Sequence, residues 1–243
     1  MSQGPEHPSA GSSAAGSELN ERARRALREA RGEAVVVLAV DVALLVGLAV
    51  IDKAKGWEII DLSWWAWLLL AAPALLLMVL LLAVPLAELS PGRVRNAGVV
   101  LLGLLAASDA LGVGVLLAAL AGSSAGSLSG GELLAHGAVV WLSNIITFGL
   151  LFWQLDEGGP RVRAERGRID PDFQFPQDAV RRVDWSPRLS DYLYVSLTNA
   201  IAVSPTDTMP LTRRAKGLMA VESLISYAVV ILVVSRAVNV LGA

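Results

Sequence analysis

Residues 64–87 read WWAWLLLAAPALLLMVLLLAVPLA, a stretch without a single charge. A helix needs about 20 apolar residues to cross roughly 30 Å of hydrocarbon, so this stretch predicts a transmembrane helix. Four further apolar blocks of similar length carry at most two charges each: 34–51, 97–121, 133–155 and 217–241. The sequence therefore predicts an all-α integral membrane protein with about five transmembrane helices.

The composition points to the same class of protein. Of 243 residues, 54% are hydrophobic and 17% charged, against roughly 45–50% and about 25% in soluble domains. The net charge of −2 indicates no nucleic-acid partner. The chain has no Cys and two His, which excludes thiolate and multi-histidine metal centres. We expect no catalytic residue, metal or cofactor, and hence no enzyme. The excess of Arg over Lys suggests a bacterial source.

The blocks divide the chain into five regions. We expect a disordered Gly/Ser/Ala/Pro-rich tail over 1–17 and a basic amphipathic helix over 18–33. A four-helix transmembrane region over 34–155 follows, and then an Arg-rich loop over 156–189. The last region, 190–243, holds a short helix, a turn and the last transmembrane helix.

The short apolar segment 190–203 reads SDYLYVSLTNAIAV. The chain carries no charge from Tyr192 to Thr206, a length of about 22 Å as a helix that rises about 1.5 Å per residue. That length falls short of a bilayer, so the segment is expected to form a re-entrant helix. Pro205 and Pro210 would end it.

Arginines set the expected orientation, because basic residues in short flanks stay in the cytoplasm. The N-terminal helix, Arg93, Arg95 and the seven Arg of 156–189 fall on one side of a five-span bundle. We therefore expect a multi-pass protein of the inner (plasma) membrane with a cytoplasmic N-terminus. The C-terminus is external if 190–203 is re-entrant and internal if it spans.

Residues 194–207 read YVSLTNAIAVSPTD, and Pro210 follows. This stretch, with the helix after it, resembles the pore module of two-transmembrane potassium channels, whose filter region reads approximately TLTTVGYGD. The resemblance covers about a fifth of the chain and implies a pore helix, a filter, an inner helix and assembly into a homotetramer. It places pore residues at Asn199, Val203, Ser204, Pro205, Thr206 and Asp207.

The sequence departs from this family at the filter itself. Potassium filters coordinate the ion with backbone carbonyls, and their glycines adopt positive φ. Ser204, Pro205 and Thr206 stand where the family has Gly-Tyr-Gly. Proline locks φ at a negative value and restricts the residue before it, so we expect a remodelled pore that is not selective for potassium.

Three acids lie inside predicted spans: Asp41, Asp109 and Glu222. A charge at membrane depth costs about 2.5–3.5 kcal/mol on insertion scales, so each acid is a candidate ion or proton site. The alternative is a structural hydrogen bond or ion pair. His136 and Asn144, two turns apart in the fourth span, are expected to hydrogen-bond across helices.

Three functions remain open. The first is an ion-channel-like protein with pore-mouth groups at Asn199, Ser204, Thr206 and Asp207. The second is a proton-coupled carrier of a small solute, which would use Asp41, Asp109 and Glu222. The third is a non-conducting scaffold or accessory subunit. The lipid bilayer is the one partner common to all three.

Overall fold

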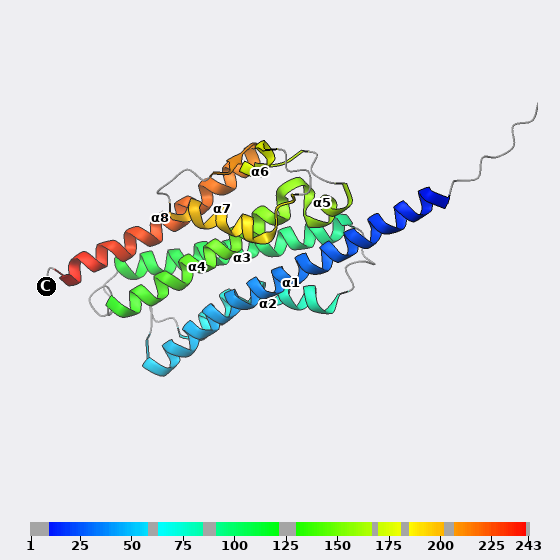
Figure 1. Cartoon of the computed structure of the whole chain (residues 1–243). Coiled ribbons are helices and arrows are strands. Elements are labelled where there is room, and N and C mark those ends of the chain that lie inside the picture. Colours follow the sequence, from blue (N-terminus) through cyan, green and yellow to red (C-terminus); the bar gives the residue numbers. More distant parts are fainter. Residues whose placement is uncertain are drawn as a thin grey trace, which may run out of the picture.

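The computed structural model describes residues 10–57, 63–84, 91–121, 130–166, 170–180, 185–201 and 207–241. Within these residues, five helices are long and apolar enough to cross a membrane: Arg24–Lys55, Trp65–Ala83, Arg95–Ala119, Gly130–Gly158 and Arg213–Leu232. They run along one another in an elongated bundle (Figure 1). The expected all-α membrane protein with five spans is confirmed.

The first four long helices alternate in direction: α1 (Ala10–Lys55), α2 (Trp65–Ala83), α3 (Pro91–Ala121) and α4 (Gly130–Leu155). Each of them packs against the next in sequence, and α1 also contacts α4. We call the end where α1 and α3 enter the bundle the arginine-rich end, because Arg24, Arg31, Arg93 and Arg95 lie there. Lys53 and Lys55 lie at the opposite end.

Helix α1 begins earlier than the sequence suggested. It runs for 46 residues from Ala10, so residues 10–17, which we expected in a disordered tail, are helical. The basic helix expected over 18–33 continues into the first span without a break. Alanine is the strongest helix former, and lengthening an existing helix is cheaper than starting one. Residues 1–9 lie outside the described part of the chain.

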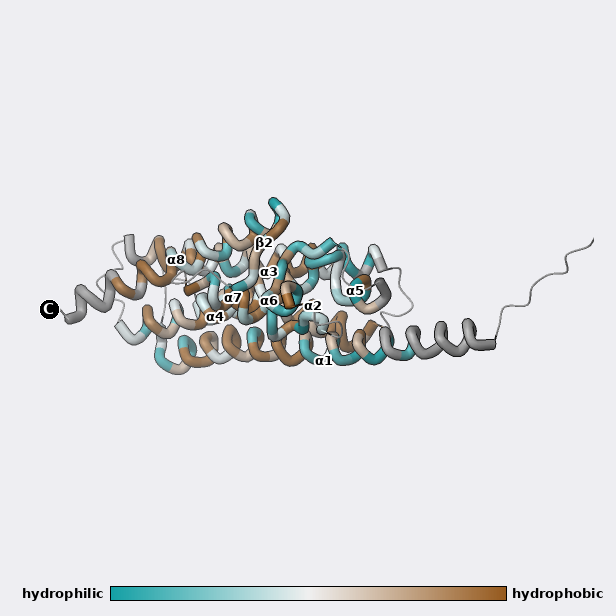
Figure 2. Tube along the Cα trace, turned by 45° about the horizontal axis from the view of Figure 1, so that its top comes forward, coloured by the Kyte–Doolittle hydropathy of each residue, from teal (hydrophilic) through white to brown (hydrophobic). Residues whose placement is uncertain are grey.

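Helix α4 is the centre of the bundle. It contacts α1, α3, α7 (Leu189–Ile201) and α8 (Arg213–Leu241). The outer helices expose large apolar side chains instead, with Leu69 on α2 63% exposed and Leu224 on α8 70% exposed. Figure 2 shows these apolar stretches as brown bands along the long helices. Such faces suit contact with lipid tails.

The Arg-rich segment 156–189 is more ordered than the loop we expected. It contains a 3-10 turn (Asp156–Gly158), α5 (Pro160–Arg166), strand β1 (Phe173–Gln174) and α6 (Pro176–Ala179). Phe173 and Phe175 are buried against the ring of Tyr192, with centroids 6.2 and 5.3 Å away. These aromatic contacts hold the segment on the bundle, so its described part contains more regular structure than the expected Arg-rich loop.

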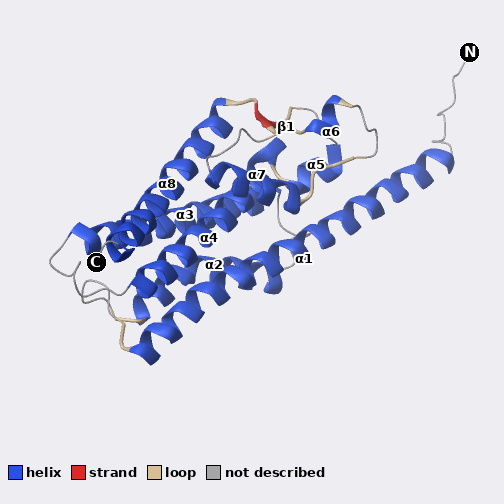
Figure 3. Ribbon diagram, turned by 60° about the vertical axis from the view of Figure 1, so that its left-hand side comes forward, coloured by secondary structure: helices blue, strands red, loops and turns tan. Residues whose placement is uncertain are grey.

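The chain enters and leaves the segment that contains helix α7 at the same end of the bundle. Helix α7, with 13 residues, spans about 20 Å, which is too short for a bilayer. It begins at the arginine-rich end, and the chain returns there because β2 (Met209–Pro210) pairs antiparallel with β1. Helix α8 starts at that same end and finishes at the opposite one (Figures 1 and 3). The structure thus has the expected short helix at this position, and its re-entrance into the membrane stays a prediction.

Candidate functional site

The buried polar side chains of the spans gather on helix α4. His136, Ser143, Asn144 and Thr147 of α4 are all fully buried. They face acids or polar groups of three neighbouring helices: Asp52 on α1 for His136, Asp109 on α3 for Ser143 and Thr147, and Ser226 on α8 for Asn144. Ser143 and Asn144 stand near the middle of α4, and consecutive residues on a helix point about 100° apart. Two polar clusters therefore lie at one depth on adjacent faces of α4.

The first cluster is the central acid pair, Asp41 of α1 and Asp109 of α3. The Ser143 hydroxyl donates a hydrogen bond to Asp109 Oδ1 at 2.7 Å and also lies near Asp41. The two carboxyl groups are close enough to interact electrostatically. Their exposed fractions are 0% and 5%, and each stands near the middle of its span.

Several oxygen atoms of the central acid pair have no partner. Among the described residues, none forms a hydrogen bond with either oxygen of Asp41 or with Asp109 Oδ2. Two ionised carboxylates in a medium of low dielectric constant would repel each other strongly. The pair is therefore stable when it holds a proton or a cation. No group of three or more His, Cys, Asp or Glu suited to a metal ion occurs in the described residues.

The second cluster is the Glu222 network between α4, α7 and α8. Glu222 is fully buried, and its carboxyl oxygens are hydrogen-bonded to Ser196 Oγ and to Asn199 Nδ2, the latter at 2.6 Å. Ser196 Oγ also lies 2.7 Å from the carbonyl oxygen of Ile145. A hydroxyl has one proton to donate, so a protonated Glu222 completes both of these bonds. Asn144 Nδ2 donates to Ser226 Oγ at 2.8 Å beside them.

The residues predicted to form a pore are placed only in part. Val203, Ser204, Pro205 and Thr206 lie outside the described residues, while Asp207 is exposed in a bend before β2. Asn199 is half-buried, and its amide donates to Met219 O at 2.9 Å as well as to Glu222. Asn199 therefore holds α7 against α8, and nothing in the described chain brings it to Asp207.

A third polar group lies at the opposite end, where His136 forms the expected hydrogen bond across helices, while its partner Asp52 was missed from the sequence. His136 Nε2 lies 3.0 Å from Asp52 Oδ2, and the indole N–H of Trp67 donates to that same oxygen at 2.8 Å. His136 Nδ1 is 2.7 Å from the carbonyl oxygen of Glu132, so Nδ1 carries a proton. Asp52 is the first residue after the apolar block 34–51, a position that normally lies in the interface. One signal for this group was available in the sequence. The predicted spans alternate in direction, which brings the end of α1 together with the starts of α2 and α4.

A fourth polar group joins segment 156–189, α7 and α8 at the arginine-rich end. Asp156 accepts hydrogen bonds from the Tyr192 hydroxyl and from the backbone N–H of Asp172, the latter at 2.6 Å. Arg163 donates to the carbonyl oxygens of Trp153 and Asp156, and Arg214 pairs with Asp172. These contacts fix both ends of the α7 segment to the end of α4. Their role is structural.

Comparisons with known proteins add nothing to this geometry. No family model, no curated protein and no solved structure matches the chain. The resemblance to the potassium-channel pore module therefore gains no support from them.

Proposed function

We propose that this chain is a proton-coupled transporter of a small solute, with the central acid pair as its proton site. The observation that carries the proposal is the juxtaposition of Asp41 and Asp109, buried at mid-span, with three of their four carboxyl oxygens lacking a hydrogen-bond partner among the described residues. Buried carboxyls at bilayer depth are a recurrent feature of proton relays in transporters. The large majority of buried side-chain polar atoms in folded proteins have a partner, which sets Asp41, with two such oxygens, apart.

The surroundings of the acid pair support alternating protonation. Asp41 and Asp109 come from α1 and α3, while Ser143, which donates to Asp109, comes from α4. A change in the charge of the pair alters the attraction between three helices at once. Movement of α1 or α3 against α4 would thereby follow proton binding, which is the coupling that a carrier requires.

We place the protein in the inner (plasma) membrane with the arginine-rich end in the cytoplasm. This end carries Arg24, Arg28, Arg31, Arg93 and Arg95, and the opposite end carries Lys53 and Lys55. The arginine excess in short flanks supports this orientation. Helix α7 then enters from the cytoplasm, whereas the pore helix of a potassium channel enters from outside. Because this entry side is opposite to that of a potassium channel, we propose a carrier and not a channel.

The test uses proteoliposomes loaded with a pH-sensitive dye. Solutes are added outside in turn, covering amino acids, sugars, polyamines and alkali cations, and proton movement is followed. We expect at least one solute to drive proton movement in the wild type, and Asp41→Asn and Asp109→Asn each to reduce its rate at least tenfold. Glu29→Gln, which removes an exposed acid from the same helix as Asp41, should leave the rate unchanged.

A second measurement does not depend on knowing the solute. Infrared difference spectra between acidic and alkaline pH report protonated carboxylic acids in the membrane interior. We expect a carboxylic acid band that loses intensity in Asp41→Asn and in Asp109→Asn. A spectrum that is the same in the wild type and both variants would contradict a proton site at this pair.

A channel-like tetramer is the second candidate. The observation that favours it is α7, a 13-residue helix that lies between α4 and α8 and is bonded to α8 through Asn199, as a pore helix lies against an inner helix. The same proteoliposomes separate the two candidates. Ion flux down a gradient that persists in Asp109→Asn and falls in Asp207→Ala would favour the channel. A chain that moves neither protons nor ions would be a scaffold.

A further inference from the structure

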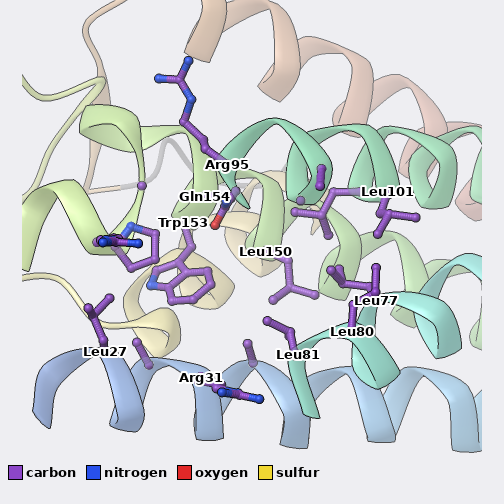
Figure 4. Close-up of a pocket in the computed structure, with 18 of the residues that line it drawn as sticks. Leu27, Arg31, Leu77, Leu80, Leu81, Arg95, Leu101, Leu150, Trp153 and Gln154 are labelled. Atoms are coloured by element: carbon purple, nitrogen blue, oxygen red, sulfur yellow. The ribbon is translucent and has the colours of Figure 1, made fainter. Parts of the chain in front are cut away.

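A large pocket opens at the arginine-rich end between α1, α2, α3, α4 and the start of α5. Its volume is about 750 Å³, within the range of about 300–1,000 Å³ found for ligand sites. Its inner part is lined by apolar side chains from four helices, among them Leu38, Leu77, Leu81, Leu101 and Leu150. Figure 4 shows leucine side chains from α2, α3 and α4 around this space, next to the ring of Trp153.

The lining of the pocket carries charge of one sign. Six arginines belong to it: Arg24, Arg28, Arg31, Arg93, Arg95 and Arg161. No acidic residue is among the lining residues that the structure describes. Guanidinium groups bind phosphate with paired N–H donors and keep their charge at any physiological pH. The pocket thus combines an apolar interior with phosphate-binding side chains among its lining residues.

The position of the pocket matches one leaflet of a bilayer. On α1 its lining runs from Arg24 to Leu38, about 21 Å of helix at 1.5 Å per residue. Half of the hydrocarbon core is about 15 Å thick. Arg31 and Arg95 come shortly before the apolar blocks 34–51 and 97–121, so these arginines stand at the boundary of the apolar region and the leucines below it.

We propose that this pocket binds one anionic phospholipid from the leaflet at the arginine-rich end. The phosphate lies among the arginines, and an acyl chain lies along the leucines of α1, α2, α3 and α4. A free phosphate would leave the apolar interior empty, and a zwitterionic lipid would bring a quaternary ammonium group beside the arginines together with its phosphate. This site is separate from the central acid pair and does not depend on the proposed transport.

The test measures lipid retention by the full chain, purified in a neutral detergent. Dioleoyl phosphatidylglycerol, dioleoyl phosphatidylcholine and inorganic phosphate are titrated separately, and bound molecules are counted by native mass spectrometry. We expect one phosphatidylglycerol to be retained at least tenfold more tightly than phosphatidylcholine, with no retained phosphate. Equal retention of the two lipids would overturn the proposal, as would tight binding of phosphate alone.

Two variants change the two halves of the pocket separately. Arg31→Gln combined with Arg95→Gln should lower retention of phosphatidylglycerol to the level of phosphatidylcholine. Ala97→Trp places a large ring at the lining from an exposed position of α3 and should reduce retention of both lipids. Arg25→Gln is the matched control, because Arg25 is exposed on α1, pairs with Glu21 and is not part of the lining.

A spectroscopic readout locates the acyl chain. Brominated acyl chains quench tryptophan fluorescence on contact, and Trp153 lines the pocket. Brominated phosphatidylglycerol should quench the wild type more than Trp153→Phe. Unchanged retention in both pocket variants, or equal quenching with and without Trp153, would show that the lipid binds elsewhere, and the proposal would be wrong.

Discussion

At the scale of single residues, two buried aspartates on α1 differ in their surroundings. Asp52 Oδ2 has partners in His136 and Trp67 although its Oδ1 has none among the described residues, whereas both oxygens of Asp41 lack a hydrogen bond there. A satisfied buried group stabilises the fold it belongs to, while an unsatisfied one is costly and calls for a functional reason. Asp52 is therefore structural on this reasoning, and Asp41 belongs to the proposed proton site.

The Asp52–His136 pair gives the residue-scale prediction. In His136→Ala, Asp52 Oδ2 keeps Trp67 and loses His136. Removing one partner of a buried ion pair costs about 3–5 kcal/mol, and we expect a loss of that size. In Asp52→Asn the atom at the Oδ2 position can accept from Trp67 or donate to a neutral imidazole but not both, so one hydrogen bond is lost and we expect a loss of about 1 kcal/mol. Thermal unfolding of both variants in detergent measures this order of stability.

The reverse order would show that Asp52 carries an isolated charge and that His136 contributes little. Leu134→Ala provides a control on the same helix, because Leu134 is 56% exposed on the surface of α4. We expect that change to leave the stability nearly unaltered.

The burial of some of these acids could be predicted from the sequence, and the burial of others could not, for a physical reason. Asp41, Asp109 and Glu222 interrupt apolar runs, so their burial could be predicted from the run itself. Asp52 and Asp156 each follow directly after an apolar block. A charge at that position usually reaches water, and its burial depends on which other helix ends pack over it. That packing is a property of the fold and not of the local sequence.

At the scale of elements, one glycine sets how closely α7 approaches α4. A Cβ atom at Gly149 would lie 3.1 Å from Leu193 Cα and 2.7 Å from Leu193 Cδ2. The backbone contact cannot be relieved by a change of rotamer, so α7 would have to move. Short helices held by few contacts depend on such close approaches, because little of their stability is internal.

Gly149→Ala should therefore loosen α7 and the Glu222 network that it carries. We expect a loss of about 1–3 kcal/mol of stability, the usual cost of overpacking, and faster hydrogen exchange across residues 189–201. Gly103→Ala is the matched control, because Gly103 is exposed in α3 with no atom within 4 Å of an added Cβ. It should be neutral or gain up to about 1 kcal/mol from helix propensity. Equal effects of the two changes would contradict the close approach.

The elements themselves were largely predictable. The five spans follow from block length, and the short α7 follows from a run of uncharged residues that cannot cross a bilayer. The regular structure and the contacts of segment 156–189 were not predictable. Strand β1 pairs with β2 although α6 and α7 lie between them in the sequence, and Asp156 receives its donors from Asp172 and Tyr192. Such long-range pairs leave no periodic pattern in the local sequence.

At the scale of the whole molecule, the path of the chain fixes the relative position of its ends. Four helices alternate in direction, α7 returns to the end where it entered, and α8 then crosses. An odd number of crossings places the start of α1 and the end of α8 on opposite sides of the membrane. The potassium-channel arrangement, with an inner helix that ends in the cytoplasm, is incompatible with this path if the arginine-rich end is cytoplasmic.

The absence of native cysteine makes this topology directly measurable. We expect Lys55→Cys and Ala243→Cys to react from one side with a membrane-impermeant thiol reagent, and Arg25→Cys from the other. With the arginine-rich end inside, the first two react in intact cells and the third only after permeabilisation. If Ala243→Cys reacts together with Arg25→Cys, residues 189–212 cross the membrane and α7 is not re-entrant. If Arg25→Cys reacts in intact cells and the other two sites react only after permeabilisation, the path of the chain stands and the arginine-rich end faces outward. The lipid site would then draw on the outer leaflet.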